Sequence, residues 1–305
     1  MPSSTSTQLE LVACNLCGGS DFTVRYNSPL RVGDQEVGDF MASTDRFDRY
    51  GRIVRCRRCG LVYANPRPSR RQISDAYARV ADHDYAEESS SRSINAHLSL
   101  HAIRRFVDRG RLLDVGCATG YFLNAARISF EPHGVELSRW AVEHARTVLN
   151  LPVHQGSLED ADFPDGWFDV VTLTDVIEHL TDPRACLEKV HRLLRPQGLL
   201  YLVTPNIDSL SAHVLRGRWW GLRPAHLYYF SAKTLTAMLA KVGFEPVRVK
   251  SYGRVFTYSY WASRLKSYPR PVPAVVNALI RWLNIEDKVL YLDTRDSVEV
   301  CALRR

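Results

Sequence analysis

Four cysteines near the start of the chain fall into two closely spaced pairs. Each pair has the spacing Cys-x-x-Cys and is followed by a glycine. The four residues are Cys14, Cys17, Cys56 and Cys59. A Cys-x-x-Cys turn directs both of its sulfurs at one point, and two such turns complete a tetrahedral site for Zn²⁺. Because four thiolates leave no open position on the metal, we expect this zinc site to be structural.

The segment "LLDVGCATGYF", residues 112–122, ends a predicted strand in an acid and continues into a turn with two glycines. It has neither the Gly-x-Gly-x-x-Gly pattern of dinucleotide-binding proteins nor the Gly-Lys-Ser/Thr of a phosphate-binding loop. It fits Asp-x-Gly-x-Ala-x-Gly instead, formed by Asp114, Gly116, Ala118 and Gly120. Small residues in this turn let a ligand approach the backbone, and the carboxylate suits a cationic group.

A second acid, Glu136, ends the next predicted strand. A carboxylate at this place accepts hydrogen bonds from both ribose hydroxyls and repels a 2′-phosphate. Asp114 and Glu136 together therefore suit a ligand that joins an amino acid to a nucleoside and has no phosphate. S-adenosylmethionine (SAM) has this composition, and we expect it to be the cofactor.

Four ordered blocks, "LLDVGCATG", "GVELS", "HQGSLED" and "FDVVTLTDVIEHLTDP", resemble class I SAM-dependent methyltransferases over about residues 106–250. The similarity is greatest to the ubiquinone-biosynthesis O-methyltransferase-like group. The N-terminal "CGLVYANPRP" resembles bacterial members found with sugar, polysaccharide or secondary-metabolite pathways. The resemblance implies that the cofactor-binding residues are Asp114, Gly116, Cys117, Gly120, Glu136, Leu137, Ser157, Leu158 and Asp175.

The motif "DVIEHL" contains the candidate catalytic residues. Asp175, Glu178 and His179 are spaced i, i+3, i+4, which predicts one face of a helical turn beyond the fourth strand. We expect His179 to be the general base, because an imidazole ordinarily titrates near pH ~6.5, and Glu178 to orient it. His226 is the alternative base. Some members of the resembled group hold a divalent metal with such residues, so the resemblance leaves Mg²⁺ open as a further cofactor.

The aromatic stretch "RWWGLRPAHLYYFS", residues 218–231, is a candidate wall for the acceptor. The alternative is a packed cap without contact to the substrate. Arg218 and Arg223 are candidates for binding an anionic group of the acceptor. The aromatic residues are Trp219, Trp220, Tyr228, Tyr229 and Phe230.

The elements that must position these residues alternate between strands and helices from residue 111 onward. This alternation predicts an α/β fold with a doubly wound, mostly parallel, Rossmann-like sheet, which the resemblance sets at seven strands. We expect the final strand to be an edge strand, because its residues alternate. The predicted strands are 111–117, 132–137, 153–157, 168–176, 198–206, 245–253 and 296–305.

Three regions are predicted: a zinc-ribbon-like segment at 1–66, a helical linker or cap at 67–105 and the methyltransferase domain at 106–305. An insertion at about 253–293 interrupts the last region. Apolar residues at helical spacing in the insertion favour core packing, and the alternatives are a substrate lid, a dimer face or a membrane-surface helix. These residues are Val275, Val276, Leu279, Ile280 and Leu283.

Composition limits the function classes. The 305 residues include 40 Lys and Arg against 33 Asp and Glu, and this mild basic excess favours anionic partners. The first residues lack the basic and apolar regions of a signal peptide, which predicts a cytoplasmic protein.

We expect a SAM-dependent methyltransferase whose small-molecule acceptor is a hydroxyl of a sugar, polysaccharide or secondary-metabolite precursor, and a homodimer is left open. An RNA base methyltransferase is the alternative, because the Arg-rich stretch 52–71 could bind phosphates. A non-catalytic zinc-ribbon adaptor is the third.

Overall fold

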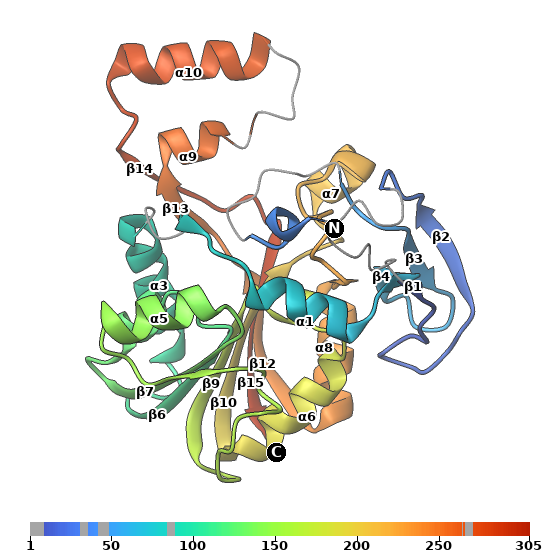
Figure 1. The fold of residues 1–305 in the computed structure, drawn as a ribbon, viewed down its shortest axis with the longest axis vertical. Coiled ribbons are helices and arrows are strands. Elements are labelled where there is room, and N and C mark those ends of the chain that lie inside the picture. Colours follow the sequence, from blue (N-terminus) through green and yellow to red (C-terminus); the bar gives the residue numbers. More distant parts are fainter. Residues whose placement is uncertain (1–8, 31–35, 42–48, 84–88, 264, 266–270) are drawn as a thin grey trace, which may run out of the picture.

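A seven-stranded sheet forms the centre of the computed structural model, with helices on both of its faces (Figure 1). The structure describes residues 9–30, 36–41, 49–83, 89–263, 265 and 271–305. The strand order is β12-β15-β10-β9-β6-β7-β8. The strands are β6 Gly110–Val115, β7 Phe130–Glu136, β8 Val153–Gln155, β9 Phe168–Thr174, β10 Leu194–Pro205, β12 Phe244–Ser251 and β15 Ser297–Arg304.

The central strands run parallel. β6 pairs in parallel with β7 and β9, β7 with β8, and β9 with β10, whereas β15 is antiparallel to both β10 and β12. Strands covered on both faces need continuous apolar sequence, and β9 and β10 supply it. The predicted doubly wound, mostly parallel, seven-stranded sheet is confirmed. Its carboxyl-terminal edge gathers the ends of β6, β7, β9 and β10.

The last strand, β15, lies inside the sheet, so the predicted edge strand at 296–305 was wrong. Its polar Glu299 is 1% exposed. The Tyr201 hydroxyl donates to Glu299 Oε2 at 3.0 Å, and Lys250 Nζ lies 3.5 Å from Glu299 Oε1. Because these partners satisfy the carboxylate, an alternating strand can occupy an internal position.

Helices cover the two faces of the sheet (Figure 1). One face packs against α3 Ser89–Ile103, α4 Tyr121–Ala126 and α5 Arg139–Thr147, and the other against α6 Pro183–Leu193 and α8 Ala232–Val242. The predicted N-cap of α5 is confirmed, since Ser138 Oγ accepts from the Ala141 amide at 3.1 Å. α8 ends at Gly243, whose φ of 97° is the left-handed conformation of a helix C-terminus.

The N-terminal segment forms a second sheet, and one of its strands, β11, comes from a distant part of the chain. Its order is β11-β4-β3-β2, with β11 Tyr228–Tyr229 paired to β4. A short ladder joins β1 to β5, and the helices η1 and α1 follow β2 and β5 respectively. The bounds are β1 Leu9–Glu10, β2 Phe22–Tyr26, η1 Val37–Phe40, β3 Ile53–Cys56, β4 Val62–Ala64, β5 Arg67–Pro68 and α1 Arg70–Ala78.

The aromatic stretch at 218–231 is mostly a packed cap. Trp219, Tyr228, Tyr229 and Phe230 are each at most 2% exposed and do not line the pocket described below. For these four the prediction of an acceptor wall was wrong, because they pack against the N-terminal sheet and the central sheet. The fifth, Trp220, does reach the pocket. The helices α7 Leu210–Leu215 and η3 Arg216–Arg218 precede this cap.

A projecting arm, defined here as β13, α9, α10 and β14, extends beyond the carboxyl-terminal edge of the sheet (Figure 1). It comprises β13 Arg254–Thr257, α9 Tyr258–Ser263, α10 Pro271–Leu283 and β14 Val289–Leu292. Core packing of α10 was a wrong prediction. Val275 and Leu279 are 65% and 51% exposed, and Ile280 is the buried member of the helix. Among the described residues, no helix is both long and apolar enough to span a bilayer.

A buried arginine ties the N-terminal segment to the central sheet. Arg67 is 7% exposed, and its Nη1 donates to the Tyr228 hydroxyl at 2.9 Å while Nη2 donates to the Thr181 carbonyl at 2.8 Å. The guanidinium carbon also lies 5.6 Å from the centre of the Tyr228 ring. These contacts join β5 to β11 and to the loop before α6.

We predict that Arg67→Ala lowers the free energy of unfolding by about 3 kcal/mol, because two charged hydrogen bonds are lost from a buried site. Urea unfolding followed by circular dichroism measures this change. Arg71→Ala is the control, since the Arg71 side chain is 92% exposed, and it should leave the free energy of unfolding unchanged. Equal unfolding free energies for the two variants would contradict the structural role of Arg67.

Candidate functional site

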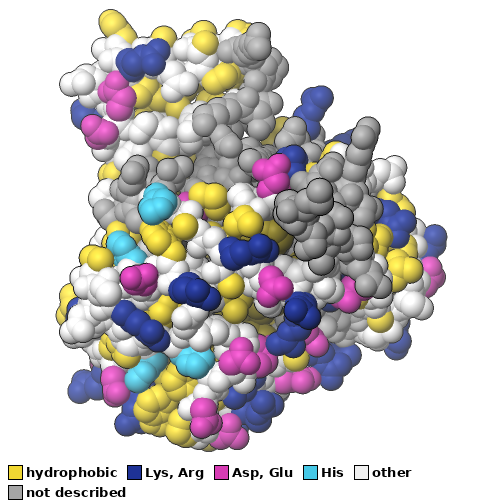
Figure 2. Space-filling model, in the orientation of Figure 1, with side chains coloured by type: hydrophobic (Ala, Val, Ile, Leu, Met, Phe, Trp, Pro, Cys, Tyr) yellow, Lys and Arg dark blue, Asp and Glu magenta, His cyan; other side chains and the backbone are white. Residues whose placement is uncertain are grey.

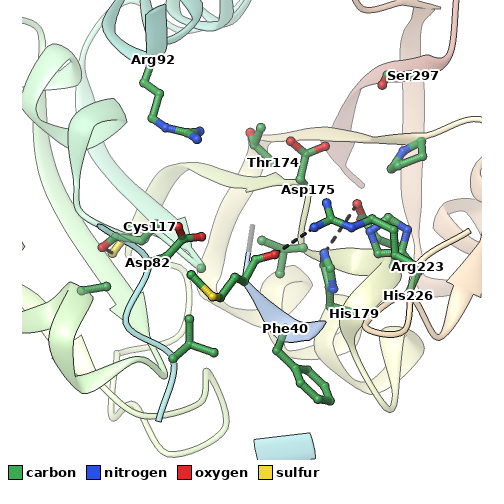
Figure 3. A pocket seen from close by; sticks show the side chains of 18 of the residues that line it. Phe40, Asp82, Arg92, Cys117, Thr174, Asp175, His179, Arg223, His226 and Ser297 are labelled. Carbon is green, nitrogen blue, oxygen red and sulfur yellow. Dashed lines mark hydrogen bonds and ion pairs between the residues drawn. The ribbon is translucent and has the colours of Figure 1, made fainter. Parts of the chain in front are cut away.

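A cavity of about 840 Å³ lies at the carboxyl-terminal edge of the central sheet (Figure 3). The ends of β6, β7, β9 and β10 line it, together with residues of η1, α1, α3 and the arm. Open α/β sheets bind their ligands at this edge. All the predicted cofactor-binding and catalytic residues line the cavity except Gly120.

The turn after β6 bends through left-handed backbone at Gly116, Ala118 and Gly120, with φ of 72°, 46° and 85°. A Cβ on Gly116 would come within 2.6 Å of Val176 Cγ2, beside the cavity. A Cβ on Gly120 would come within 2.6 Å of Leu151 Cδ1 instead. The absence of a side chain at Gly116 therefore leaves room for Val176 beside the cavity. The absence of a side chain at Gly120 lets the start of α4 pack closely against Leu151.

Asp114 lies at the base of the cavity with 5% of its surface exposed. The Thr172 hydroxyl donates to Asp114 Oδ1 at 2.6 Å. Burial raises the pKa of Asp114 to about 7, and the charge of Glu136 adds to this shift while the Thr172 hydrogen bond opposes it. A cationic ligand group would favour the ionised carboxylate.

Glu136 holds the glycine turn to the start of α5. Its Oε2 accepts from the Ala118 amide at 3.0 Å, and its Oε1 accepts from the Ser138 amide at 2.8 Å. Burial raises the pKa of Glu136, and the amide hydrogen bonds oppose that shift. Each carboxylate oxygen can accept a further hydrogen bond, so Glu136 can bind hydroxyl groups in the cavity as well.

The remaining predicted cofactor residues lie around these two carboxylates. Leu137 and Leu158 give the cavity apolar surface, and Cys117 is buried beside Asp114. The Ser157 hydroxyl donates to Asp160 Oδ2 at 2.6 Å, which fixes its orientation. The Ser157 oxygen still has acceptor capacity toward a ligand.

The expected helical face of Asp175, Glu178 and His179 was wrong. Asp175 has a φ of 55°, and only Ile177–His179 form a short 3₁₀ turn, η2. The Asp175 amide donates to the Val203 carbonyl, and its Oδ1 accepts from Arg254 Nη2 of the arm at 2.6 Å. Asp175 therefore points away from the other two residues.

His226 takes the place that Asp175 was expected to have. Glu178, His179 and His226 form a cluster in which one ligating atom from each lies within 4.8 Å of the others. Figure 3 shows the two imidazoles side by side, and their ring centres are 4.6 Å apart. Glu178 Oε2 accepts from the Thr204 hydroxyl at 2.9 Å, whereas its buried Oε1 has no hydrogen-bond partner among the described residues.

Backbone carbonyls orient both histidines. His226 Nδ1 lies 2.8 Å from the Gly221 carbonyl, and His179 Nδ1 lies 3.1 Å from the Ala225 carbonyl. Since a carbonyl only accepts, His226 Nδ1 carries the proton and its Nε2 keeps the lone pair, whereas His179 Nδ1 also has a hydroxyl neighbour that can donate or accept. Tyr77 was not expected from the sequence, yet its hydroxyl is 2.6 Å from His179 Nδ1.

Burial disfavours the charged form of each group in this cluster. Burial and the nearby Arg223 charge lower the pKa of His179 to about 4, and burial with the His179 charge lowers the pKa of His226 well below its ordinary value. Burial and the Asp175 charge raise the pKa of Glu178 to about 8. The two imidazoles can accept a proton or bind a metal without first losing one.

The four N-terminal cysteines meet at one point. Cys14 Sγ lies 3.4 Å from Cys59 Sγ, Cys17 Sγ lies 3.5 Å from Cys56 Sγ, and all four sulfurs lie within 4.8 Å of one another. Zn–S bonds of about 2.3 Å in a tetrahedron require sulfurs about 3.8 Å apart. The donor set and its closeness therefore fit Zn²⁺.

The first cysteine turn is anchored on the methyltransferase region. Asn15 Nδ2 donates to Asp182 Oδ1 at 2.8 Å, and Asn15 Oδ1 accepts from the Arg184 amide at 2.9 Å. Lys241 Nζ donates to the Leu16 carbonyl at 2.7 Å. The cysteine cluster is thus fastened to α6 and α8 and lies outside the cavity lining.

Several arginines of the stretch 52–71 have partners within the protein, whereas Arg55 and Arg58 are exposed. Arg67 is buried, and Arg52 Nε donates to the Asn65 carbonyl at 2.7 Å. Arg57 and Arg70 lie 3.3 and 3.5 Å from Asp21 and Glu159. Acidic and basic side chains are interspersed over the face seen in Figure 2.

Comparison with known proteins agrees with this geometry. Residues 71–249 match the family described as "Methyltransferase domain". A probable SAM-dependent methyltransferase of Mycolicibacterium smegmatis is 32% identical over 44% of this chain and 51% of its own. A ubiquinone biosynthesis O-methyltransferase of Parvibaculum lavamentivorans is 33% identical over 39% of this chain and 49% of its own. A tRNA U34 carboxymethyltransferase of Syntrophotalea carbinolica is 28% identical over 61% of this chain and 55% of its own. The chain spans about half the length of the curated relatives it matches.

Solved structures support the fold. A SAM-dependent methyltransferase from Archaeoglobus fulgidus superposes with a TM-score of 0.50 at 20% identity, covering 73% of this chain and 100% of its own. A chain of the complex between the Haloferax volcanii Trm112 methyltransferase activator and its methyltransferase gives a TM-score of 0.52 at 19% identity, covering 77% and 97%. The family match spans more than half of the residues. The cavity at the sheet edge is lined by all the predicted cofactor-binding and catalytic residues except Gly120. The chain therefore belongs to the methyltransferase-domain family, in which the named relatives include SAM-dependent methyltransferases.

Proposed function

We propose that the protein binds SAM in the cavity and transfers its methyl group to a hydroxyl of a small-molecule acceptor. One observation carries this proposal: two carboxylates, the buried Asp114 and the half-buried Glu136, line one cavity at the ends of adjacent parallel strands, with a glycine turn between them. Asp114 suits the ammonium of an amino acid, and Glu136 suits ribose hydroxyls.

His179 is the proposed general base. When bound, SAM supplies a methyl group that an acceptor oxygen takes by in-line displacement. The chain's part is to hold the acceptor in line and to remove its proton. The proposal uses the tautomer in which His179 Nδ1 donates to the Ala225 carbonyl and Nε2 keeps the lone pair. Glu178 Oε1, 4.0 Å from that nitrogen, offers the protonated ring a carboxyl partner, and His226 lies alongside.

Mg²⁺ does not fit the residues of this cluster. Two imidazole nitrogens and one carboxylate oxygen are donors that transition metals prefer, whereas Mg²⁺ prefers oxygen ligands. The Asp175 carboxylate, which would add oxygen, is paired with Arg254. The proposed reaction therefore uses no Mg²⁺.

A small acceptor is favoured over RNA. The cavity is bounded by η1, α1, α3 and the arm, and within the Arg-rich stretch Arg67 is buried while Arg57 and Arg70 lie near acids. Arg218 and Arg223 line the cavity and would favour an acceptor with an anionic group. The N-terminal cysteines would hold a structural Zn²⁺ apart from this chemistry.

We predict that Glu136→Gln weakens SAM binding about tenfold to a hundredfold, because an amide cannot accept all the hydrogen bonds of the carboxylate. Isothermal titration calorimetry with SAM measures the dissociation constant. Glu143→Gln is the matched control, since Glu143 is an exposed residue of α5, and it should bind like the unmodified protein. If both variants bind equally well, Glu136 is not a cofactor ligand.

We predict that His179→Ala retains SAM affinity and loses about a hundredfold in methyl transfer, because it removes the proton acceptor. The assay incubates protein and methyl-tritiated SAM with the dialysable fraction of an extract from cells that make the protein, and counts labelled products. The exposed His101→Ala variant is the control. Incorporation by His179→Ala at the control rate would remove His179 from the reaction, and no incorporation by the unmodified protein would count against the proposed function.

We predict one Zn²⁺ per chain, measured by inductively coupled plasma mass spectrometry. Cys17→Ser should abolish the bound zinc, because three thiolates and a hydroxyl make a much weaker tetrahedral site. Cys186→Ala, which changes a buried thiol in α6, should retain it. Zinc that is absent from the unmodified protein, or retained in Cys17→Ser, would rule out the Cys₄ site.

A further inference from the structure

The cavity has two chemically different parts. The part nearest β6 and β7 contains the carboxylates Asp114 and Glu136 described above. The other part is bounded by the arm, and its surface is aromatic and aliphatic. Six arm residues form this apolar wall: Phe256, Tyr260, Trp261, Val276, Ile280 and Leu292.

The apolar wall is already assembled. The rings of Phe256 and Tyr260 stack with centres 3.9 Å apart, and Trp261 meets Phe256 edge-on at 5.4 Å. Trp261 Nε1 donates to the Leu290 carbonyl at 3.2 Å, so its polar atom is satisfied within the arm. The indole therefore offers mainly hydrocarbon surface to the cavity.

Helix α10 presents apolar residues in two directions. Val276 and Ile280, four residues apart, face the cavity, and Ile280 is 7% exposed. Val275, the neighbour of Val276, is 65% exposed and does not line the cavity. Among the described residues, Val276 and Ile280 belong to none of the three hydrophobic core clusters, which accounts for the failure of the core-packing prediction.

An ion pair separates the two parts. Arg254, the first residue of β13, donates to Asp175 Oδ1 at 2.6 Å and lies over the Tyr252 ring at 5.1 Å. Because Arg254 and Asp175 neutralise each other, neither residue requires a charged group on the ligand. Asn95, Thr294 and Asp296 also line the cavity and can bind hydroxyls, but sugar hydroxyls placed against the hydrocarbon surface of the apolar wall would lose water without gaining a hydrogen bond, at a cost in binding free energy.

From these observations we infer that the acceptor is amphiphilic: its hydroxyl-bearing head lies at Glu178, His179 and His226, and an apolar chain lies along the arm. This inference rests on the proposed function and adds the chemical class of the acceptor. The chain can be aliphatic or aromatic, since both kinds of surface line the wall. Binding such a chain removes apolar area from water on both partners, which drives association.

The test uses methyl, butyl, hexyl and octyl glucoside, each below its micelle-forming concentration. Calorimetric titrations are run with and without S-adenosylhomocysteine, so the result does not depend on occupancy of the cofactor part. Affinity is expected to rise about fourfold per methylene along the butyl, hexyl and octyl series. An affinity that does not depend on chain length would overturn the inference.

A matched pair of substitutions localises the chain. Val276→Asp puts a charge on the apolar wall and should weaken octyl glucoside about tenfold while leaving the weak methyl glucoside unchanged. Val275→Asp puts the same charge on the outer side of the same helix and should behave like the unmodified protein. Equal losses in both variants, or in neither, would place the chain elsewhere and contradict the inference.

The two proposals fail in different ways. If S-adenosylhomocysteine binds but affinity is independent of chain length, the amphiphilic acceptor is wrong and the methyltransferase function stands. If the chain-length dependence appears but neither SAM nor S-adenosylhomocysteine binds, the apolar site stands and the proposed function is wrong. Circular dichroism of both Asp variants verifies that the helical content is unchanged.

Discussion

The site depends on placing two carboxylates, the buried Asp114 and the half-buried Glu136, at the ends of adjacent parallel strands. Burial penalises their charge, so the pKa values of Asp114 and Glu136 rise, and the fold must stabilise the ionised forms by other means. Thr172 donates to the first, and the backbone amides of Ala118 and Ser138 donate to the second. These hydrogen bonds also fix the glycine turn against the start of α5. The contacts that shape the cavity thus partly offset the free-energy cost of removing the two carboxylates from water. A ligand would offset the rest with an ammonium group near Asp114 and vicinal hydroxyls near Glu136.

Features determined by neighbouring residues could be predicted from the sequence. The strand ends at Asp114 and Glu136 and the cap at Ser138 follow from local apolar runs and local hydrogen-bonding residues. Asp175 could not be predicted in the same way. Its left-handed backbone is held by the Val203 carbonyl, and its side chain is held by Arg254, which is 79 residues away in the chain. The internal place of β15 likewise depends on Tyr201 and Lys250, which satisfy Glu299 from the two neighbouring strands. Sequence periodicity carries no information about such distant partners.

The proposed catalytic cluster combines local and distant contributions. Glu178 and His179 come from η2, just beyond β9, and were expected at the sheet edge. His226 approaches them from the loop that leads into β11, and Tyr77 approaches from α1. Three segments therefore meet at His179, whose Nδ1 lies near both the Ala225 carbonyl of the His226 loop and the Tyr77 hydroxyl. Most aromatic residues of that loop region are buried as packing, while Trp220 and His226 line the cavity. Composition alone does not separate the packed residues of this stretch from those that reach the cavity.

The borrowed strand β11 has a consequence for how this protein can be recombined with its relatives. It completes the sheet begun by β4, while Asn15 and Leu16 bind α6 and α8 from the other direction. Exchanging the first 66 residues alone would leave these interlocking surfaces mismatched, with Tyr228 and Tyr229 opposite a foreign strand. Two segments that depend on each other in this way are expected to diverge together. A functional chimaera would therefore need the cysteine segment and the stretch before α8 from the same parent protein.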